Sequence, residues 1–328
     1  MPLEIEVPPG GKRQTGTVVI GLINNMPDGA LRATETQFAS LLTEAAGTRP
    51  VRLRLSYLPE VPRDPPAREH LQSAYWPLDS LLAAVPDALI VTGTEPRSSR
   101  LEEEPYWDRI VELLGWTQTH ATPSIWSCLA AHAAALALDG IQRQRLPEKR
   151  FGVFTHQVTA EHPLLRGVGG TLVTPHSRWN ELPVESLRAA GYTLASLSSE
   201  SGADCFVRED RGPLLCFQGH PEYETHTLLL EYRRDVGRFL RGEYNAWPNL
   251  PQDYFSPEAL TILNAFRARA ESARDPALFA EFPTGELAAG MVARWRPAAV
   301  RIYRNWLEQL IATRERTRAP QHASMMQT

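Results

Sequence analysis

The sequence predicts an α/β fold with a mostly parallel β-sheet that is covered by helices on both faces. Short apolar segments, each suited to one buried strand, alternate along the chain with segments in which apolar residues recur at helical spacing. Gly93, Cys128 and His220 each follow such a strand, which is where parallel sheets carry their functional residues. Of the 328 residues, 43% are hydrophobic, and this composition suits a soluble globular protein with a substantial core.

The opening residues of the chain include Pro-Pro-Gly-Gly at 8–11, which indicates a flexible lead-in over residues 1–16. Thr34 is a suitable N-cap for the first long helix, and the proline-rich residues 59–66 are expected to form a loop. Val51–Leu58 alternates as a strand does. The other expected strands are Thr17–Asn24, Ala88–Thr92 and residues 123–127, and the expected helices include a short one that closes at Leu81–Val85, one over Tyr106–Thr117 and one that begins at Cys128.

After Phe151 the pattern becomes richer in strands, and the chain then ends in helices. Residues 17–242 are expected to form the α/β domain, residues 243–315 a helical C-terminal extension, and residues 316–328 a disordered tail. The expected strands are Gly152–Thr159, Thr171–Thr174, Tyr192–Ser198, Asp204–Arg208 and Leu214–Phe217, and the expected helices are Glu224–Leu240, Pro257–Ala273 and Val292–Ala312.

Composition excludes several classes of function. A net charge of −4 gives no sign of the basic face that nucleic-acid-binding proteins carry. The chain has no apolar run of about 18 residues, which a membrane-spanning helix needs, and its first residues do not resemble a secretory signal. Cys128, Cys205 and Cys216 form an odd and unclustered set, which argues against a disulfide framework or a metal site and for the cytoplasm.

Cys128 is the strongest candidate for chemistry. It stands where a short strand changes into a helix, so its thiol is expected on a tight, exposed turn beside the first amides of that helix. Those amides and the helix dipole stabilise a thiolate and can hold a developing oxyanion. Cys205 and Cys216 lie in apolar surroundings and are expected to be ordinary buried side chains.

His220 is the matching candidate for a base. It follows the strand that ends at Phe217 and lies between Gly219 and Pro221, so its ring projects from the end of the strand. Glu222 would lie against that ring and orient it if the chain turns at the proline, with Glu224 as the alternative. The competing interpretation of His220 is a cap for the helix that follows. A nucleophile, a base and an orienting acid together favour an enzyme.

The order of short motifs resembles the homoserine O-acyltransferase (homoserine transsuccinylase) family, which shares the flavodoxin-like fold of the class I glutamine amidotransferases. The resemblance covers about Val18 to Leu240 and returns at 295–310. The motifs that carry it are Asn-Met-Pro (25–27), Thr-Glu-Thr-Gln-Phe (34–38), Leu-Ile-Val-Thr-Gly (89–93), Tyr-Trp (106–107), Cys128, Glu-Lys-Arg-Phe-Gly-Val (148–153), Pro-His-Ser-Arg (175–178), Gly-His-Pro-Glu-Tyr (219–223) and Glu-Tyr-Arg-Arg-Asp (231–235).

This resemblance implies that Cys128 accepts an acyl group from acyl-CoA as a thioester and passes it to the hydroxyl of homoserine, with His220 as general base and Glu222 as its partner. It further implies that Lys149, Ser177, Arg234 and Glu231 contact the substrates. Arg234 could pair with the carboxylate of the amino acid and Glu231 with its ammonium group. Without the resemblance, a solvated helix face would be the simpler interpretation of Glu231 and Arg234.

Two segments depart from the family pattern. The residues around Cys128 lack the Gly-x-Cys-x-Gly of the amidotransferases, which disfavours ammonia-channelling chemistry. The segment after Gly93 reads Thr-Glu-Pro-Arg-Ser-Ser-Arg (94–100), which brings Arg97 to the position where the family selects its acyl group. A cation there favours succinyl-CoA over acetyl-CoA.

Several alternatives stay open. The acceptor could be serine or another hydroxy amino acid, and the same fold could support a cysteine hydrolase or amidotransferase. A relative that only binds a metabolite or acyl-CoA is the rival outside enzymology. We expect small-molecule substrates, no bound cofactor or metal, no nucleic-acid or membrane partner, and a homodimer.

Overall fold

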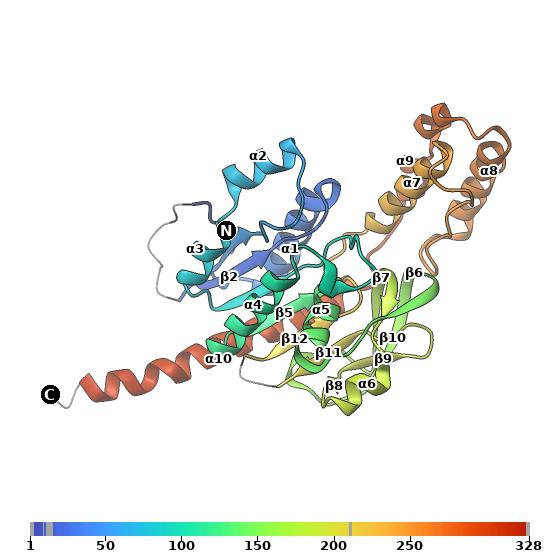
Figure 1. Cartoon of the computed structure of the whole chain (residues 1–328). Helices are drawn as coiled ribbons and strands as arrows, with labels where there is room; N and C mark the ends of the chain where they lie inside the picture. The colour runs from blue at the N-terminus through green and yellow to red at the C-terminus, as the bar shows by residue number, and fades with distance from the viewer. Residues whose placement is uncertain (1–2, 9, 11–15, 210–211, 326–328) are drawn as a thin grey trace.

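The main sheet of the chain contains eight strands (Figure 1). They are β1 (Leu3–Ile5), β2 (Val18–Ile23), β3 (Val51–Ser56), β4 (Ala88–Val91), β5 (Ser124–Ser127), β8 (Thr193–Leu194), β11 (Cys205–Arg208) and β12 (Leu214–Phe217). The computed structural model describes residues 3–8, 10, 16–209 and 212–325, with side chains as far as residue 316.

The strand order β1-β3-β2-β4-β5-β12-β11-β8 confirms the predicted fold class. Neighbours from β1 to β12 pair in parallel, whereas β11 pairs antiparallel with both β12 and β8. The segment β3-β2-β4-β5-β12 has the strand order of flavodoxin-like folds, in which ligands bind at the carboxyl ends of the strands.

A second sheet of four antiparallel strands lies beside the first in the order β10-β9-β6-β7. Its strands are β6 (Gln144–Val158), β7 (Thr171–Glu181), β9 (Ser196–Ser198) and β10 (Gly202–Ala203). The prediction of one strand over Tyr192–Ser198 is wrong, because the chain leaves the main sheet at Ala195 and continues in the second sheet. Strands β6 and β7 are longer than predicted and therefore include Lys149 and Ser177.

Helices cover both faces of the main sheet, as expected. Helices α1, α2 and α10 share one apolar cluster with the sheet, and α3, α4, α5 and α6 share the other. The helices are α1 (Leu31–Ala46), α2 (Pro65–Ala74), α3 (Leu78–Ala83), α4 (Trp107–Thr119), α5 (Leu129–Asp139), α6 (Val184–Ala189), α7 (Thr227–Leu240), α8 (Pro257–Ala273), α9 (Thr284–Ala288) and α10 (Arg296–Met325).

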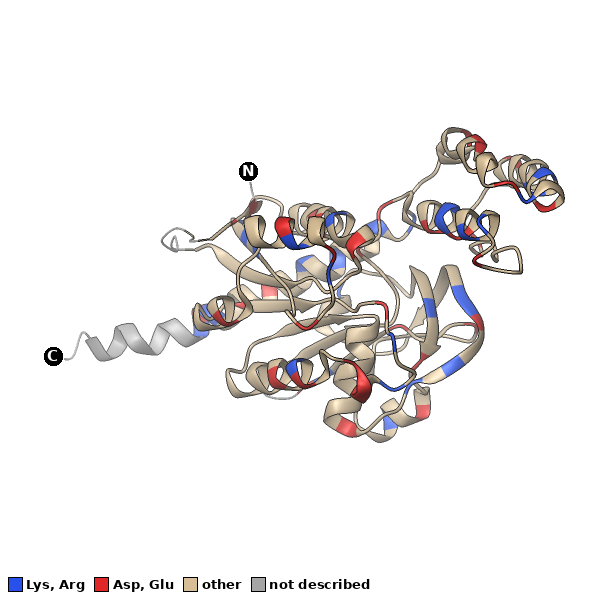
Figure 2. Cartoon of the chain, turned by 45° about the horizontal axis from the view of Figure 1, so that its top comes forward, with Lys and Arg blue, Asp and Glu red and all other residues tan. Residues whose placement is uncertain are grey.

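A third apolar cluster joins α7 to α8 and α9, which project from the rest of the molecule (Figure 1). Helix α10 returns to pack against α1 and the main sheet. The domain boundary at residue 242 stays a prediction. Figure 2 shows basic and acidic residues interspersed along the helices, in keeping with the small net charge. Among the described residues, no helix is both long and apolar enough to cross a membrane.

Four local predictions are corrected. The lead-in contains strand β1, which pairs in parallel with β3. Thr34 is a buried residue inside α1, which begins at Leu31, because the preceding 3-10 turn over Asp28–Ala30 starts the helix earlier. The loop expected over 59–66 ends at Asp64, which caps α2 by accepting a hydrogen bond from the Ala67 amide at 2.9 Å. Helix α10 continues to Met325, whereas disorder was expected from residue 316, and residues 326–328 lie outside the described part.

The polar residues of β3 are buried, although the alternating pattern is typical of a strand with one solvated face. Arg52 and Arg54 are 5% and 7% exposed. Both pair with Glu6, at 3.2 Å and 2.6 Å, because β1 covers this edge of the sheet. Strand β1 therefore buries charges that an uncovered edge would have left in water.

Candidate active site

Cys128 lies on a sharp turn between β5 and α5, as the sequence predicted. Its backbone has φ 53° and ψ −114°, a combination that few residues other than glycine adopt. The Cys128 amide donates to the Phe217 carbonyl at 2.7 Å, which ties the turn to the end of β12. The strained turn moves the half-buried thiol out of the line of the strand and directs the first turn of α5 toward that thiol. Cys205 and Cys216 are buried, as predicted.

The loop after β4 lies directly against this turn. A Cβ atom on Gly93 would lie 2.6 Å from Leu129 Cβ and 2.9 Å from the Leu129 nitrogen, so only glycine fits without movement. The Leu129 amide is the first of α5 and has no carbonyl of its own helix to donate to. An oxyanion that develops on a group bound to Cys128 would find this amide beside it.

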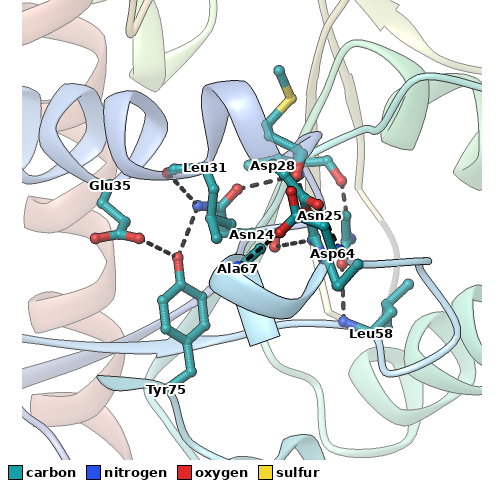
Figure 3. A network of polar contacts seen from close by, with 12 residues as sticks. Asn24, Asn25, Asp28, Leu31, Glu35, Leu58, Asp64, Ala67 and Tyr75 are labelled. Atoms are coloured by element: carbon teal, nitrogen blue, oxygen red, sulfur yellow. Dashed lines mark hydrogen bonds and ion pairs between the residues drawn. The ribbon is translucent and has the colours of Figure 1, made fainter. Parts of the chain in front are cut away.

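The loop after β2 supports the Gly93 loop through Asn25, which belongs to the network of polar contacts that Figure 3 shows. The Asn25 amide donates to Thr92 Oγ1 at 2.8 Å, and the Asn25 side chain donates to the Thr92 carbonyl at 3.1 Å. Asn25 Oδ1 also accepts from the Leu58 amide at 3.0 Å. Asn24, whose side chain donates to the Leu31 carbonyl and to Tyr75 Oη, joins the same network to α1. These bonds fix the Asn-Met-Pro motif to the residue before Gly93.

His220 and Glu222 lie against one another after β12, as predicted. His220 Nδ1 is 2.8 Å from Glu222 Oε1, and the two residues are 5% and 4% exposed. Burial alone would lower the pKa of His220, but the charges of Glu222 and Cys128 and hydrogen bonds to both raise that pKa well above its ordinary value. The ring is therefore stabilised as a cation beside the sulfur. Glu224, the alternative partner, lies instead near Arg296, at 3.8 Å.

The four residues assigned to the substrates share one cluster, which lies between β6, β7 and α7. Ser177 Oγ donates to Glu231 Oε2 at 2.5 Å, and Lys149 Nζ lies 3.5 Å from the same oxygen. Lys149 Nζ also lies 3.5 Å from Asp235 Oδ2, and Arg234 Nε donates to Asp235 Oδ1 at 2.9 Å. Asp235 is thus a further member of this cluster. It belongs to the Glu-Tyr-Arg-Arg-Asp motif, but the sequence indicated no role for it.

Tyr223 connects this cluster to the His220 pair. Its ring stacks on the His220 ring with the centroids 4.3 Å apart, and its hydroxyl donates to Glu231 Oε1 at 2.7 Å. Glu231 therefore accepts from two hydroxyl groups and lies near the Lys149 ammonium. Tyr223 belongs to the Gly-His-Pro-Glu-Tyr motif, but nothing in the sequence distinguished its side chain.

Arg97 is exposed and lines a pocket of about 380 Å³ together with Pro27, Glu104 and Tyr106. Its amide and that of Ser98 both donate to Glu104 Oε1 at 2.6 Å, so the Glu104 carboxylate holds the loop. The position predicted for acyl selection therefore lies in a defined pocket.

A buried polar group lies beneath His220. Among the described residues, His156, His176 and Asp204 are the only group whose ligand atoms are close enough to share a metal ion. His176 Nδ1 accepts from Arg178 Nε at 3.2 Å, which leaves its proton on Nε2, 3.6 Å from Asp204 Oδ1. Burial and the charge of Arg178 hold the pKa of His176 well below its ordinary value, so the ring is neutral. Within the described part of the chain, His156 Nδ1 and His176 Nε2 have no hydrogen-bond partner.

Asp204 also positions the backbone that carries His220. Asp204 Oδ1 accepts from the Gly219 amide at 2.8 Å, and Oδ2 accepts from Thr174 Oγ1 at 2.8 Å. A Cβ on Gly219 would lie 2.6 Å from Thr174 Cγ2 and 2.8 Å from Asp204 Oδ1, so a glycine is required there. The His220 amide donates to the Pro175 carbonyl at 2.8 Å. None of these contacts is visible in the sequence, because they join three distant segments.

Known proteins resemble this chain over most of its length. The sequence model of the family described as "Homoserine O-succinyltransferase" matches residues 11–316. A protein of that name from Rhodopseudomonas palustris is 46% identical over 293 residues, which are 89% of this chain and 88% of the relative. A second protein of that name, from Bradyrhizobium japonicum, is 42% identical, and the match covers 92% of this chain and 94% of the relative.

The chain belongs to the homoserine O-succinyltransferase family. The family resemblance inferred from the motifs is confirmed. A solved glutamine amidotransferase from Methylobacillus flagellatus superposes with a TM-score of 0.53 at 15% identity, over 90% of this chain and 95% of the other. This likeness shows that the chain has the fold of that amidotransferase.

Proposed function

We propose that this chain transfers the succinyl group of succinyl-CoA to the hydroxyl of homoserine through a thioester on Cys128. The observation that carries the proposal is the thiol on a strained strand–helix turn beside the buried His220–Glu222 pair. Family membership supplies the acyl donor and the acceptor, because relatives that match nearly the whole chain are named homoserine O-succinyltransferase.

In the first half-reaction the Cys128 thiolate attacks the carbonyl carbon of succinyl-CoA. The Leu129 amide stabilises the oxyanion, and the intermediate collapses by breaking the bond between the carbonyl carbon and the sulfur of CoA. The departing CoA thiolate takes the proton that His220 holds. The enzyme then carries a succinyl thioester and a neutral imidazole.

In the second half-reaction homoserine enters after CoA has left. His220 removes the proton of the homoserine hydroxyl while that oxygen attacks the thioester carbon. Collapse of the second intermediate releases O-succinylhomoserine and restores the Cys128 thiolate and the His220 cation. Glu222 keeps the ring oriented and stabilises its charge in both halves.

The cluster of Lys149, Ser177, Glu231 and Arg234 is the proposed binding site for homoserine. Arg234 is half exposed, so part of its guanidinium is available to the carboxylate of the amino acid. Glu231 is the acceptor proposed for the ammonium group, and Tyr223 links it to His220. The acyl acceptor would thus be held by a residue that Tyr223 connects to the base.

Intact-protein mass spectrometry after mixing with succinyl-CoA alone tests the central step. The wild type is expected to gain the mass of one succinyl group and to lose it when homoserine is added. Cys128→Ala should show no gain. Cys216→Ala is the matched control, because Cys216 is a buried thiol in β12, and this variant should still be labelled. An unlabelled wild type, or labelled Cys128→Ala, contradicts the mechanism.

Release of succinate to water at the same rate with and without homoserine would instead favour a hydrolase on this fold. Serine tested beside homoserine decides the acceptor. The homodimer and the cytoplasmic location remain predictions, and light scattering on the purified chain tests the first.

A further inference from the structure

Arg143 lies between α5 and β6, and its side chain reaches the loop that follows β4. Its Nη2 donates to the Ser98 carbonyl at 3.2 Å and to the Ser99 carbonyl at 2.9 Å. These two residues belong to the segment 94–100, in which the acyl-selecting position lies. Arg143 therefore braces that loop.

The rest of the guanidinium has no acceptor. Arg143 Nε and Nη1 are both buried, and no described residue accepts a hydrogen bond from either. Nor does any carboxylate of the described chain form a salt bridge with Arg143, although Glu104 is close enough to influence its charge. Buried N–H groups of a charged side chain are rarely left unpaired, because each loses its hydration without compensation. An anionic ligand group would satisfy them.

The charges of Arg143 and Cys128 influence one another. Burial lowers the pKa of Arg143, and the charges of Tyr106, Glu104 and Cys128 act in the opposite direction. Arg143 also influences the buried ring of His132, one turn into α5 from Cys128. The charge of the guanidinium therefore acts on two residues at the start of α5, while its hydrogen bonds hold the loop after β4.

Arg97 differs in each of these respects. Its side chain is exposed, and only its backbone amide is fixed, through Glu104. An exposed arginine gains little from one added ion pair, whereas Arg143, with Nε and Nη1 buried and without acceptors, gains much more.

We propose that Arg143, rather than Arg97, binds the terminal carboxylate of the succinyl group and thereby favours succinyl-CoA over acetyl-CoA. This inference rests on the proposed function, because it assigns the far end of the acyl chain whose carbonyl is attached to Cys128. A charge-assisted hydrogen bond from buried nitrogen to the carboxylate stabilises the succinyl donor, and acetyl has no group that could accept it.

The test compares kcat/KM for succinyl-CoA and acetyl-CoA, with homoserine saturating, in four variants. Arg143→Gln should lower the succinyl value about 10- to 100-fold and the acetyl value far less, so the ratio of the two falls. Arg143→Lys keeps the charge and should restore part of the ratio. Arg97→Gln and Arg145→Gln remove the same charge from exposed positions and should leave the ratio near that of the wild type.

Each result decides something. An equal fall for both donors in Arg143→Gln shows that the residue only braces the loop, and overturns the inference. A changed ratio in Arg97→Gln alone returns selection to Arg97. Thermal unfolding of each variant shows whether it is folded. If Arg143→Gln is not, the ratio of the two kcat/KM values is compared between Arg143→Lys and the wild type. A wild type that transfers neither acyl group contradicts the proposed function itself, which separates that failure from failure of the assignment to Arg143.

Discussion

Replacing Gly93 by alanine tests whether the loop after β4 has to touch the first turn of α5. The new Cβ would lie 2.6 Å from Leu129 Cβ, 2.9 Å from its nitrogen and 3.2 Å from its Cα. Carbon atoms in contact prefer about 3.5 to 4.0 Å, so the loop or the turn has to move by roughly 1 Å. Neither neighbour is the flexible end of a side chain, so the strain cannot be relieved by a rotamer change.

Such a shift has two expected consequences. Overpacking of this kind destabilises a protein by about 1 to 3 kcal/mol. Misplacement of reacting groups by about 1 Å lowers the rate of the chemical step about 100-fold. Because Leu129 supplies the proposed oxyanion amide, the loss should appear in the rate of thioester formation from succinyl-CoA, with the KM for homoserine little changed.

The matched control is Gly115→Ala. Gly115 is exposed in α4, and a Cβ there would meet nothing within 4 Å. Alanine in a helix is about 1 kcal/mol more favourable than glycine, so this variant should be slightly more stable and equally active. Urea unfolding and single-turnover mass spectrometry measure both quantities. Gly93→Ala with the wild-type rate of thioester formation would refute the argument that this contact sets the geometry.

Three further predictions follow from the same geometry. Glu222→Gln removes the charge that stabilises the His220 cation, so the pKa of His220 should fall. Alkylation of Cys128 by iodoacetamide near pH 7 should then slow about 10-fold or more, and an unchanged pH profile of alkylation would count against a Cys128–His220 ion pair. Tyr223→Phe keeps the ring on His220 but removes the bond to Glu231, and should raise the KM for homoserine about 10-fold while thioester formation stays at the wild-type rate. Burial, and then the charge of Arg178, lowers the pKa of His132 to about 3, which is below its value in the unfolded chain. The stability that the neutral ring contributes is therefore complete above about pH 6.5 and is lost as the pH falls. Between pH 7 and 5.5 the wild type should lose about 1 kcal/mol more of its unfolding free energy than His132→Gln, and parallel curves of stability against pH would contradict this.

The parts of the site that the sequence predicted are those that depend on local structure. The change from strand to helix at Cys128 and the turn at Pro221 lie within a few residues of the side chains that they place. Strand β12 and helix α8 were predicted at the bounds that the structure has. Apolar periodicity specifies such elements because each buries its own pattern.

The parts that sequence reasoning missed depend on contacts between distant segments. Strand β1 was mistaken for a flexible lead-in, because its pairing with β3 depends on buried ion pairs rather than on an apolar run. The second sheet was not recognised, since β8 and β9 are separated by a single residue and belong to different sheets. Asp204 and Arg143 had no distinguishing motif, and their importance follows only from the atoms that surround them.

Those same contacts explain why the strained turn at Cys128 persists. An unfavourable backbone conformation costs about 1 to 3 kcal/mol and survives only where its surroundings determine it. Here the Cys128 amide is held by Phe217, while Asp204 and Pro175 hold the amides of Gly219 and His220. Sulfur and imidazole are thus positioned by three hydrogen bonds from backbone amides, and the bond from the His220 amide ends on the second sheet. The second sheet is therefore part of the catalytic apparatus that we propose, because β7 supplies the carbonyl on which His220 rests.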